Sequence, residues 1–494
     1  MPAVSPSDKT FQSRSPADGS VLGTYPVHGP EEVRAAVVRS RAAARRWAAA
    51  GWDGRRSALL AWKRSLARRM DEVAEAVSAE TGKPLHDART EVLLVLIHLD
   101  WAARHARRVL GRRRIPSGAT ALGQRALLAY KPVGVVGVIG PWNYPAHTPM
   151  GSIGYALAAG NGVVFKPSEL TPGVGELLAS SFADAVPPEF AELFTVVTGF
   201  GATGAALAEA GVDKVAFTGS PGTARKVAEV CARSLTPLLA ECGGKDALLV
   251  GPDADLEAAA DAAVWGAMSN AGQTCAGVER VYAVESVHAE LVERIVRKAR
   301  ELKPGEAYGP LTLPSQLAVV ERHMKEALAA GAHAPLGGPE SLRSPFVHPV
   351  VLVGVPEDTA AMREETFGPV VAVNAVRDLD EAVERANASA YSLGATVFTG
   401  SRKEGLAVAG RLDAGSVSVG SVLGYAAVPG LPFGGSGESG YGRIHGAEGL
   451  RAFASARAIT VKRFSRGTDL TSFSTSREAA GRMVELGRRL HAWR

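Results

Sequence analysis

Three residues of this sequence carry side chains suited to covalent chemistry on a carbonyl group. Cys275 lies in the run 270–277 with a glycine near it on each side, so the backbone can bend sharply and turn the thiol toward a pocket. Glu241 directly precedes a Cys-Gly-Gly run, and Asn143 lies within Pro-Trp-Asn-Tyr-Pro. A thiol, a carboxylate and a neutral amide can serve as nucleophile, base and oxyanion donor. The alternative for a lone cysteine is a small buried hydrophobe.

Three further runs come directly after predicted strands and have residues suited to a nucleotide. Run 217–220 is Phe-Thr-Gly-Ser and opens a helix, so its free backbone N–H groups suit phosphate oxygens. Run 165–169 offers a lysine and a glutamate for ribose hydroxyls. Run 199–204 has the GxGxxG spacing but comes late in its unit and lacks the expected acid downstream. We interpret it as a turn on the nucleotide side, not the pyrophosphate loop; plain turns and surface charges are the alternatives for the other two.

The elements that must position these residues alternate between helix and strand. Apolar residues at three- and four-residue spacing predict helices from about residue 30 to 113, with a solvated basic face. Residues 126–130 indicate an extended arm, and the apolar run 133–139 is typical of a strand in a parallel sheet. Further strands are predicted at 162–165, 193–197, 214–217 and 247–250, with helices at 173–185 and 203–210 between them. Such βα units predict a doubly wound sheet with ligands at the carboxyl ends of its strands.

A second α/β unit is predicted beyond residue 250. Its helices are expected at 257–271, 289–302 and 379–386, and its strands at 280–284, 370–373, 395–398 and 416–419. The tail after Val461 is basic and repeats apolar residues at helical spacing from Ala479 to Leu490. We interpret it as an amphipathic helix packed on its own subunit or a neighbour, and favour this over contact with a membrane surface.

The composition limits the classes of protein that fit. With 494 residues, 46% hydrophobic and 21% charged, the chain is long enough for two or three domains. A net charge of +5, with acids and bases interleaved and no nucleic-acid motif, gives no case for binding DNA or RNA. Three cysteines without a CxxC pair, and no apolar leader or spanning run, favour a reducing, cytoplasmic location. Cys231 and Cys242 are interpreted as structural.

From about residue 14 to 465 the chain resembles the aldehyde dehydrogenase superfamily. The resemblance rests on seven runs in matching order and spacing: Gly140-Pro141-Trp142-Asn143-Tyr144-Pro145, Lys166-Pro167-Ser168-Glu169, Phe217-Thr218-Gly219-Ser220, Glu241 with Gly243-Gly244-Lys245, Gly272-Gln273-Thr274-Cys275, Glu364-Glu365-Thr366-Phe367-Gly368-Pro369 and Pro432-Phe433-Gly434-Gly435.

The resemblance implies roles for the catalytic residues. Cys275 would attack the aldehyde carbon, with the Asn143 amide and the Cys275 backbone N–H binding the oxyanion. After hydride transfer a thioester would remain, and Glu241 would activate the water that hydrolyses it. Relatives that acylate CoA generally lack this glutamate, so its presence favours a free acid as product.

The resemblance also implies a cofactor, NAD with NADP as the alternative, and no metal. Glu169 favours NAD because a carboxylate repels a 2′-phosphate. The implied contacts are Lys166 and Glu169 at the adenosine ribose, Gly201 and Phe217 near the adenine, Gly219 and Ser220 at the pyrophosphate, Glu365 and Phe367 at the nicotinamide ribose, and Ile139, Trp142 and Ser168 elsewhere in the cofactor site. Three departures from the family pattern stand out: Cys242 replaces a leucine, Ala224 replaces a glycine, and Pro221 interrupts the run at the pyrophosphate.

The implied fold is α/β, with a Rossmann-like cofactor domain, an α/β catalytic domain and a β-arm for oligomerisation. The expected boundaries are 1–114 and 133–243 for the cofactor domain, 244–437 for the catalytic domain, 115–132 and 455–465 for the arm, and 466–494 for a basic extension. The implied assembly is a homodimer or homotetramer.

The expected reaction is oxidation of an aldehyde to its acid. The mostly apolar loop at 421–431 indicates a hydrophobic aliphatic or aromatic aldehyde. The alternatives are a succinate-semialdehyde-type dehydrogenase, a CoA-acylating relative, or a catalytically silent protein on the same fold.

Overall fold

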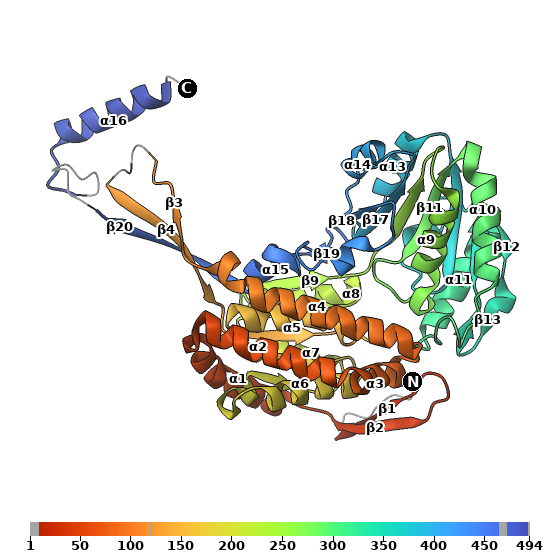
Figure 1. Cartoon of the computed structure of the whole chain (residues 1–494), viewed down its shortest axis with the longest axis horizontal. Coiled ribbons are helices and arrows are strands. Elements are labelled where there is room, and N and C mark those ends of the chain that lie inside the picture. The colour runs from red at the N-terminus through yellow and green to blue at the C-terminus, as the bar shows by residue number, and fades with distance from the viewer. Residues whose placement is uncertain (1–8, 119–120, 122, 464–471, 493–494) are drawn as a thin grey trace.

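The computed structural model describes residues 9–118, 121, 123–463 and 472–492. Two α/β lobes lie side by side, and a β-arm projects from the first lobe with the C-terminal helix near its tip (Figure 1). The sequence-predicted fold class, α/β with a Rossmann-like unit, a second α/β unit and an arm, is confirmed. No helix in the described ranges is long and apolar enough to cross a membrane.

The first lobe is built on a six-stranded sheet in the order β19-β9-β8-β5-β6-β7. All its neighbouring strands run parallel except β19, which is antiparallel to β9. The strands are β5 (Val135–Ile139), β6 (Gly162–Lys166), β7 (Phe194–Val196), β8 (Lys214–Thr218), β9 (Leu238–Glu241) and β19 (Gly440–Tyr441). Every residue of β5 and β6 is buried, as expected for strands covered on both faces.

The helices of the first lobe come before, between and after the strands of this sheet in the chain. Four come before the first strand: α1 (Pro30–Ala49), α2 (Gly51–Arg68), α3 (Met70–Thr81) and α4 (Leu85–Leu110). The others are α5 (His147–Ala159), α6 (Pro172–Ala185), α7 (Gly201–Glu209), α8 (Pro221–Arg233) and α15 (Gly446–Ala452). The helical region predicted from about residue 30 to 113 therefore holds separate helices, and Gly82 ends α3 in a left-handed conformation with φ 76°.

The second lobe holds a seven-stranded sheet in the order β12-β15-β16-β11-β10-β17-β18. Its strands are β10 (Asp246–Val250), β11 (Val278–Val284), β12 (His333–Leu336), β15 (Val350–Val353), β16 (Val370–Val376), β17 (Gly394–Phe398) and β18 (Ser416–Val419). Its helices are α9 (Leu256–Met268), α10 (Glu285–Arg300), α11 (Gln316–Ala329), α12 (Ala360–Arg363), α13 (Leu379–Asn387) and α14 (Arg402–Ala409). The strand predicted at 247–250 belongs to this sheet rather than to the first.

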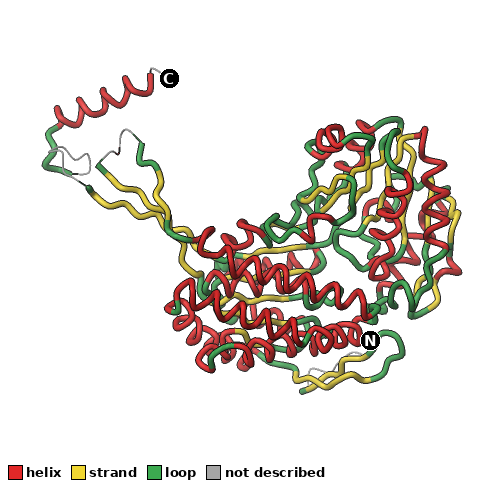
Figure 2. The backbone as a smooth tube through the Cα atoms, viewed as in Figure 1, coloured by secondary structure: helices red, strands yellow, loops and turns green. Residues whose placement is uncertain are grey.

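Smaller elements complete the chain (Figure 2). They are the hairpins β1 (Thr10–Arg14) with β2 (Val21–Pro26) and β13 (Leu342–Arg343) with β14 (Phe346–Val347), and the 3₁₀ turns η2 (Pro188–Leu193), η3 (Ser269–Gly272), η4 (Pro339–Ser341) and η5 (Gly424–Ala427). The periodicity analysis did not predict the hairpins or β9. Each of their strands is six residues or shorter, so an apolar alternation has little room to show.

The arm is an antiparallel sheet in the order β20-β4-β3. β4 (Gln124–Pro132) pairs along its length with β20 (Ala454–Lys462), and β3 (Arg113–Ile115) flanks β4. The predicted arm end at 464–465 lies outside the described residues. The tail helix α16 (Arg477–Ala492) forms as predicted, and none of its described residues is buried. Its packing on its own subunit or on a neighbour stays a prediction.

Candidate active site

One cavity of about 1000 Å³ lies between the two lobes and is lined by every residue predicted to act in catalysis or cofactor binding. These residues are Asn143, Glu241 and Cys275, together with Ile139, Trp142, Lys166, Ser168, Glu169, Gly201, Phe217, Gly219, Ser220, Glu365 and Phe367. Residues from both lobes therefore line one cavity.

Parallel pairing explains how distant runs of sequence meet at this cavity. Ile139 at the end of β5 pairs with Lys166 of β6 on one side and Phe217 of β8 on the other. The chain runs from β5 outward through β6 and β7 and then crosses back to form β8 on the other side of β5, which makes the carboxyl end of β5 a topological switch point. Ligands of doubly wound sheets bind in the crevice at such a point.

The run predicted to bind pyrophosphate opens helix α8. The Ser220 hydroxyl caps the helix by accepting a hydrogen bond from the Thr223 backbone N–H at 3.4 Å. Pro221 occupies the first helical position, where a missing N–H costs nothing because that group has no partner within the helix. Pro221 therefore starts the helix and does not disrupt the run, and the helix N-terminus suits a phosphate group.

The glutamate is brought to the same place by the neighbouring strand β9. Thr218 pairs with Glu241, and the Gly219 N–H donates to the Glu241 carbonyl at 3.1 Å. Glu241 is the last residue of β9 (Leu238–Glu241), directly before the Cys-Gly-Gly run. Strand pairing thus fixes the backbone of Glu241 relative to the nucleotide run.

Cys275 comes after a backbone segment held in an unusual conformation. Asn270, Ala271 and Gly272 have φ values of 52°, 56° and 72°, a region that costs non-glycine residues roughly 1–3 kcal/mol each. A Cβ at Gly272 would lie 2.1 Å from the Gly368 carbonyl oxygen, so only glycine fits there. The segment aims the half-buried Cys275 thiol at the cavity.

The Asn143 amide is tied to this same segment. Its Nδ2 donates to the Gln273 carbonyl at 2.9 Å, and the Asn143 carbonyl accepts from Asn270 Nδ2 at 3.1 Å. Gln273 is held in turn by its own amide, which donates to the Asn270 carbonyl at 2.9 Å. The amide and the nucleophile therefore share one rigid hydrogen-bonded frame.

Burial raises the pKa of two groups of this site, Glu241 and Cys275. Glu241 is 2% exposed, and neither of its carboxyl oxygens has a hydrogen-bond partner among the described residues. Burial raises the pKa of Glu241 to about 8. Burial and then the charge of Glu241 raise the pKa of Cys275 well above its ordinary value. A carboxyl group with a pKa near neutrality suits a general base.

Sequence reasoning missed a buried ion pair that holds the Asn143 loop. Lys83 Nζ lies 2.6 Å from Glu91 Oε2 and donates to the Asn143 carbonyl at 2.8 Å. Glu91 Oε1 accepts from the backbone N–H groups of Ala146 and His147 at 2.8 and 3.1 Å. The one signal in the sequence was a glutamate on the apolar stripe of α4.

A second missed pair supports the cofactor side. Lys245 forms a buried ion pair with Glu279, whose carboxylate also accepts from the backbone N–H groups of Thr366 and Phe367 at 2.8–3.0 Å. The Phe367 ring packs edge-on against Trp142 at 5.5 Å between centroids. Lys245 belongs to one of the seven runs that carry the family resemblance, but nothing in the sequence links it to Glu279.

The comparisons with known proteins agree with this geometry. The family model described as "Aldehyde dehydrogenase family" matches residues 3–459. A Methylomonas protein named 4,4'-diapolycopene aldehyde oxidase is 38% identical, over 90% of this chain and 84% of its own length. A Mycolicibacterium smegmatis protein named putative succinate-semialdehyde dehydrogenase [NADP(+)] is 36% identical, over 90% and 87%.

Solved structures are similar over nearly the whole chain. An aldehyde dehydrogenase from Brucella melitensis superposes with a TM-score of 0.88 at 32% identity, covering 92% of this chain and 94% of its own. An NAD⁺ complex of aldehyde dehydrogenase from Bacillus cereus gives 0.87 at 31%, covering 92% and 93%.

Proposed function

The chain belongs to the aldehyde dehydrogenase family of NAD(P)-dependent oxidoreductases, and we propose that Cys275, Glu241 and Asn143 are its catalytic residues. The observation that carries the proposal is that these three side chains line one cavity and that hydrogen bonds connect the segments of Asn143 and Cys275. The segment before Cys275 binds the Asn143 amide through Gln273, and the unpartnered Glu241 carboxyl lines the same cavity.

In the proposed reaction the Cys275 thiol first loses its proton to a base or to water. The resulting thiolate then adds to the aldehyde carbon. The carbonyl oxygen becomes an oxyanion, for which the Asn143 amide is a neutral donor. NAD(P) held by the residues described below would supply the hydride acceptor that oxidises this carbon, and the carbon would then remain bonded to the Cys275 sulfur as a thioester. Glu241 then takes a proton from water as its oxygen attacks, and the C–S bond breaks to release the acid.

The residues present fit a dinucleotide. The N-terminus of α8, which Ser220 caps, has the positive end of the helix dipole and suits a pyrophosphate. Lys166 and Glu169, with Lys166 Nζ 3.7 Å from the carboxylate, lie at the rim where a ribose would bind. Trp142 and Phe367 would enclose the nicotinamide end, with Glu365 near its ribose. We propose NAD as the preferred cofactor because of Glu169, with NADP as the alternative.

For the substrate we propose a hydrophobic aliphatic or aromatic aldehyde. The loop 421–431 is mostly apolar, and the relative named for 4,4'-diapolycopene aldehyde is the more similar of the two described above. A succinate semialdehyde is the second candidate, since another relative is named for it. A panel of apolar aldehydes and semialdehydes with both cofactors separates the two through kcat/KM.

We further propose that the first lobe binds the cofactor, that the second carries Cys275, and that the arm pairs with another copy in a cytoplasmic homodimer or homotetramer. Support comes from the arm, whose sheet projects from the lobes (Figure 1). Sedimentation of the protein with and without an arm substitution tests the assembly.

The mechanism is tested with Cys275→Ser and by omitting CoA. We expect acid and reduced cofactor to form from aldehyde without CoA, and both to fall at least about a thousandfold in the variant, because serine is a far weaker nucleophile without its own activating base. Product that requires CoA would contradict the hydrolytic role of Glu241. Unchanged reduction of cofactor in the variant would contradict the role of Cys275.

A further inference from the structure

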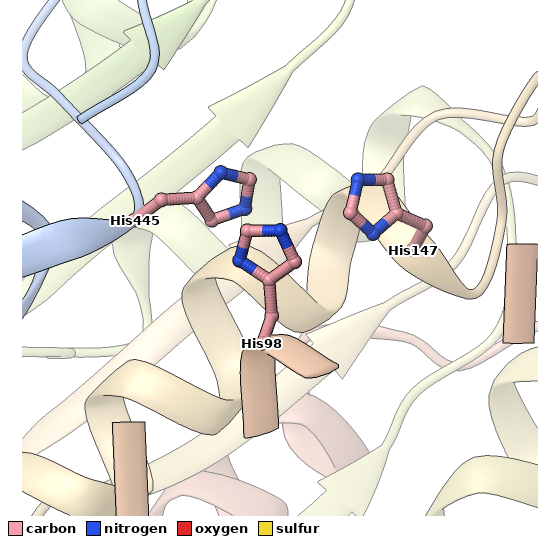
Figure 3. A group of neighbouring side chains, drawn as sticks. All are labelled: His98, His147 and His445. Carbon is pink, nitrogen blue, oxygen red and sulfur yellow. The ribbon is translucent and has the colours of Figure 1, made fainter. Parts of the chain in front are cut away.

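Three histidines outside the proposed catalytic set come together beside the active-site loop. His98 lies in the middle of α4, His147 is the first residue of α5, and His445 directly precedes α15. Figure 3 shows the three rings close together, each reaching in from a different segment. One ring nitrogen from each lies within 4.8 Å of the other two.

Two of the three ring separations are close to those of a trihistidine metal site, and the third, between His98 and His445, is shorter because these two rings lie against each other. The ring centroids are 5.2 Å apart for His98 and His147, 5.8 Å for His147 and His445, and 3.8 Å for His98 and His445. A tetrahedral ion with Zn–N bonds of about 2.0–2.1 Å holds its nitrogens about 3.4 Å apart. Side-chain rotations that bring each ligand atom inward by less than about an ångström would close the site.

The hydrogen bonds leave ligand atoms free in a buried place. His98 Nε2 lies 3.0 Å from the Ala426 carbonyl, which fixes the proton on that nitrogen and leaves Nδ1 with its lone pair. The Tyr155 hydroxyl lies 3.5 Å from Nδ1, and it also donates to the Pro429 carbonyl at the shorter distance of 3.2 Å. His147 Nδ1 and His445 Nε2 are buried and have no hydrogen-bond partner in the described part of the chain. An unpartnered buried polar atom costs roughly 1–3 kcal/mol, so a ligand that binds these two nitrogens would stabilise the folded protein.

The surroundings make room for these rings and keep them neutral. A Cβ at Gly151 would lie 2.6 Å from His445 Nε2, so a glycine on α5 leaves the space that this nitrogen occupies. Burial lowers the pKa of His147 to about 3, and it lowers the pKa of His98 and of His445 as well. Neutral imidazole is the form that binds a metal.

We propose that His98, His147 and His445 bind a divalent first-row transition metal ion of the zinc class. This departs from the sequence-based expectation of no metal, because ligands from three separate segments carry no spacing motif. The ion would join α4, the start of α5 and the segment before α15. His98 also contacts Ala426 of the proposed substrate loop, so the ion would fix that loop as well. The proposal does not depend on which aldehyde is oxidised.

The test is equilibrium binding of Zn²⁺ to the chelator-treated full chain, with Co²⁺ as a spectroscopic substitute. Because a thiolate also binds Zn²⁺, the titration is repeated in Cys275→Ser, which removes that second site. We expect one ion per chain in this background with a Kd below about 1 μM, and ligand-field bands of Co²⁺ bound to nitrogen.

Variants then assign the ion to the histidines. His98→Leu and His147→Leu should each weaken binding at least about tenfold, and Gly151→Ala should weaken it while keeping all three ligands, by displacing His445. His86→Leu is the matched control, since His86 lies on the same helix with its side chain 71% exposed. Circular dichroism and melting temperature identify any variant that does not fold. The Zn²⁺ affinities of the variants that do fold are then compared with that of His86→Leu.

The proposal is overturned if the chain binds no Zn²⁺, if binding disappears in Cys275→Ser, or if it survives both leucine variants. Equal weakening in His86→Leu would also overturn it. None of these outcomes bears on the proposed oxidation, which is read out separately by formation of acid and reduced cofactor.

Discussion

Replacing Glu241 by glutamine should separate the two halves of the reaction. The substitution keeps the shape of the buried side chain but removes the group that accepts a proton. Glu241 is 2% exposed at the end of β9. The first half-reaction, thiolate addition and hydride loss, does not use the carboxylate in our mechanism. The second half, hydrolysis of the thioester, depends on it.

The size of the effect is set by the pKa of about 8 for Glu241. At pH 7 only about one tenth of a group with this pKa is ionised, so the rate of hydrolysis should rise about tenfold per pH unit below pH 8 and level off above it. General-base catalysis contributes roughly 10²–10⁴-fold, so the glutamine variant should hydrolyse the thioester slower by that factor, with no such pH dependence.

The assay is rapid mixing of enzyme, cofactor and aldehyde, with the absorbance of the reduced cofactor recorded over time. The wild type should turn over steadily, whereas Glu241→Gln should give a burst of about one reduced cofactor per active site and then a slow phase.

Glu438→Gln is the control, because Glu438 lines the same cavity but pairs with Arg225. Loss of the burst itself would refute the reasoning, since it would assign Glu241 to deprotonation of the Cys275 thiol.

The raised pKa of Glu241 also predicts how the free energy of unfolding changes with pH: it should fall as the pH rises. The folded protein holds a proton on Glu241 up to about pH 8, whereas an unfolded glutamate loses it near its ordinary value. The folded state is therefore penalised progressively as the pH rises from about 4.5 to about 8, by at most about 5 kcal/mol. Glu241→Gln should gain free energy of unfolding over the wild type across this range. A difference independent of pH in urea titrations would contradict the burial argument.

The site supports three further predictions. Asn143→Ala should slow the burst phase by about 10²–10³-fold with little change in cofactor affinity, because it removes one oxyanion donor; an unchanged burst rate would exclude that role. Lys83→Met should leave the Glu91 carboxylate buried and unpaired and lower the free energy of unfolding by about 3–5 kcal/mol in urea titrations, whereas a loss under about 1 kcal/mol would mean the pair is not buried in solution. Glu169→Ser should raise kcat/KM for NADP at least about tenfold relative to NAD, because a repelling charge is removed from the ribose 2′ position; an unchanged ratio would show that Glu169 does not select the cofactor.

Short-range patterns account for the parts of the fold and of the site that could be predicted from the sequence. The runs that end at Ile139, Lys166 and Phe217 are apolar strands with small or polar residues directly after them, and they do end at one sheet edge. The parallel arrangement made that edge predictable, since doubly wound sheets bind ligands there. Boundaries were less predictable: α9 ends at Met268, a few residues before the predicted end at 271, because the left-handed turn before Cys275 begins there.

The partners in long-range polar contacts could not be predicted. The sequence did show that such contacts exist, because polar residues interrupt an otherwise apolar helical stripe. The buried stripe of α4 contains Glu91 and His98 among alanines, valines and leucines. Burying either group is unfavourable unless a partner is supplied. Glu91 pairs with Lys83, eight residues away, but the other partners come from farther along the chain: the Ala146 N–H for Glu91 and the Ala426 carbonyl, 328 residues away, for His98.

These two exceptions on one helix face explain how α4 can organise a site to which it contributes no proposed catalytic side chain. Glu91 fixes the backbone just after Asn143, and His98, two turns further along, holds the loop that contains Ala426. An apolar residue at either position would pack as well but would position neither segment, because dispersion contacts lack the directionality of a hydrogen bond. We therefore infer that polar residues on an otherwise apolar helical stripe mark where a helix supports a site, even where the partners are invisible in the sequence.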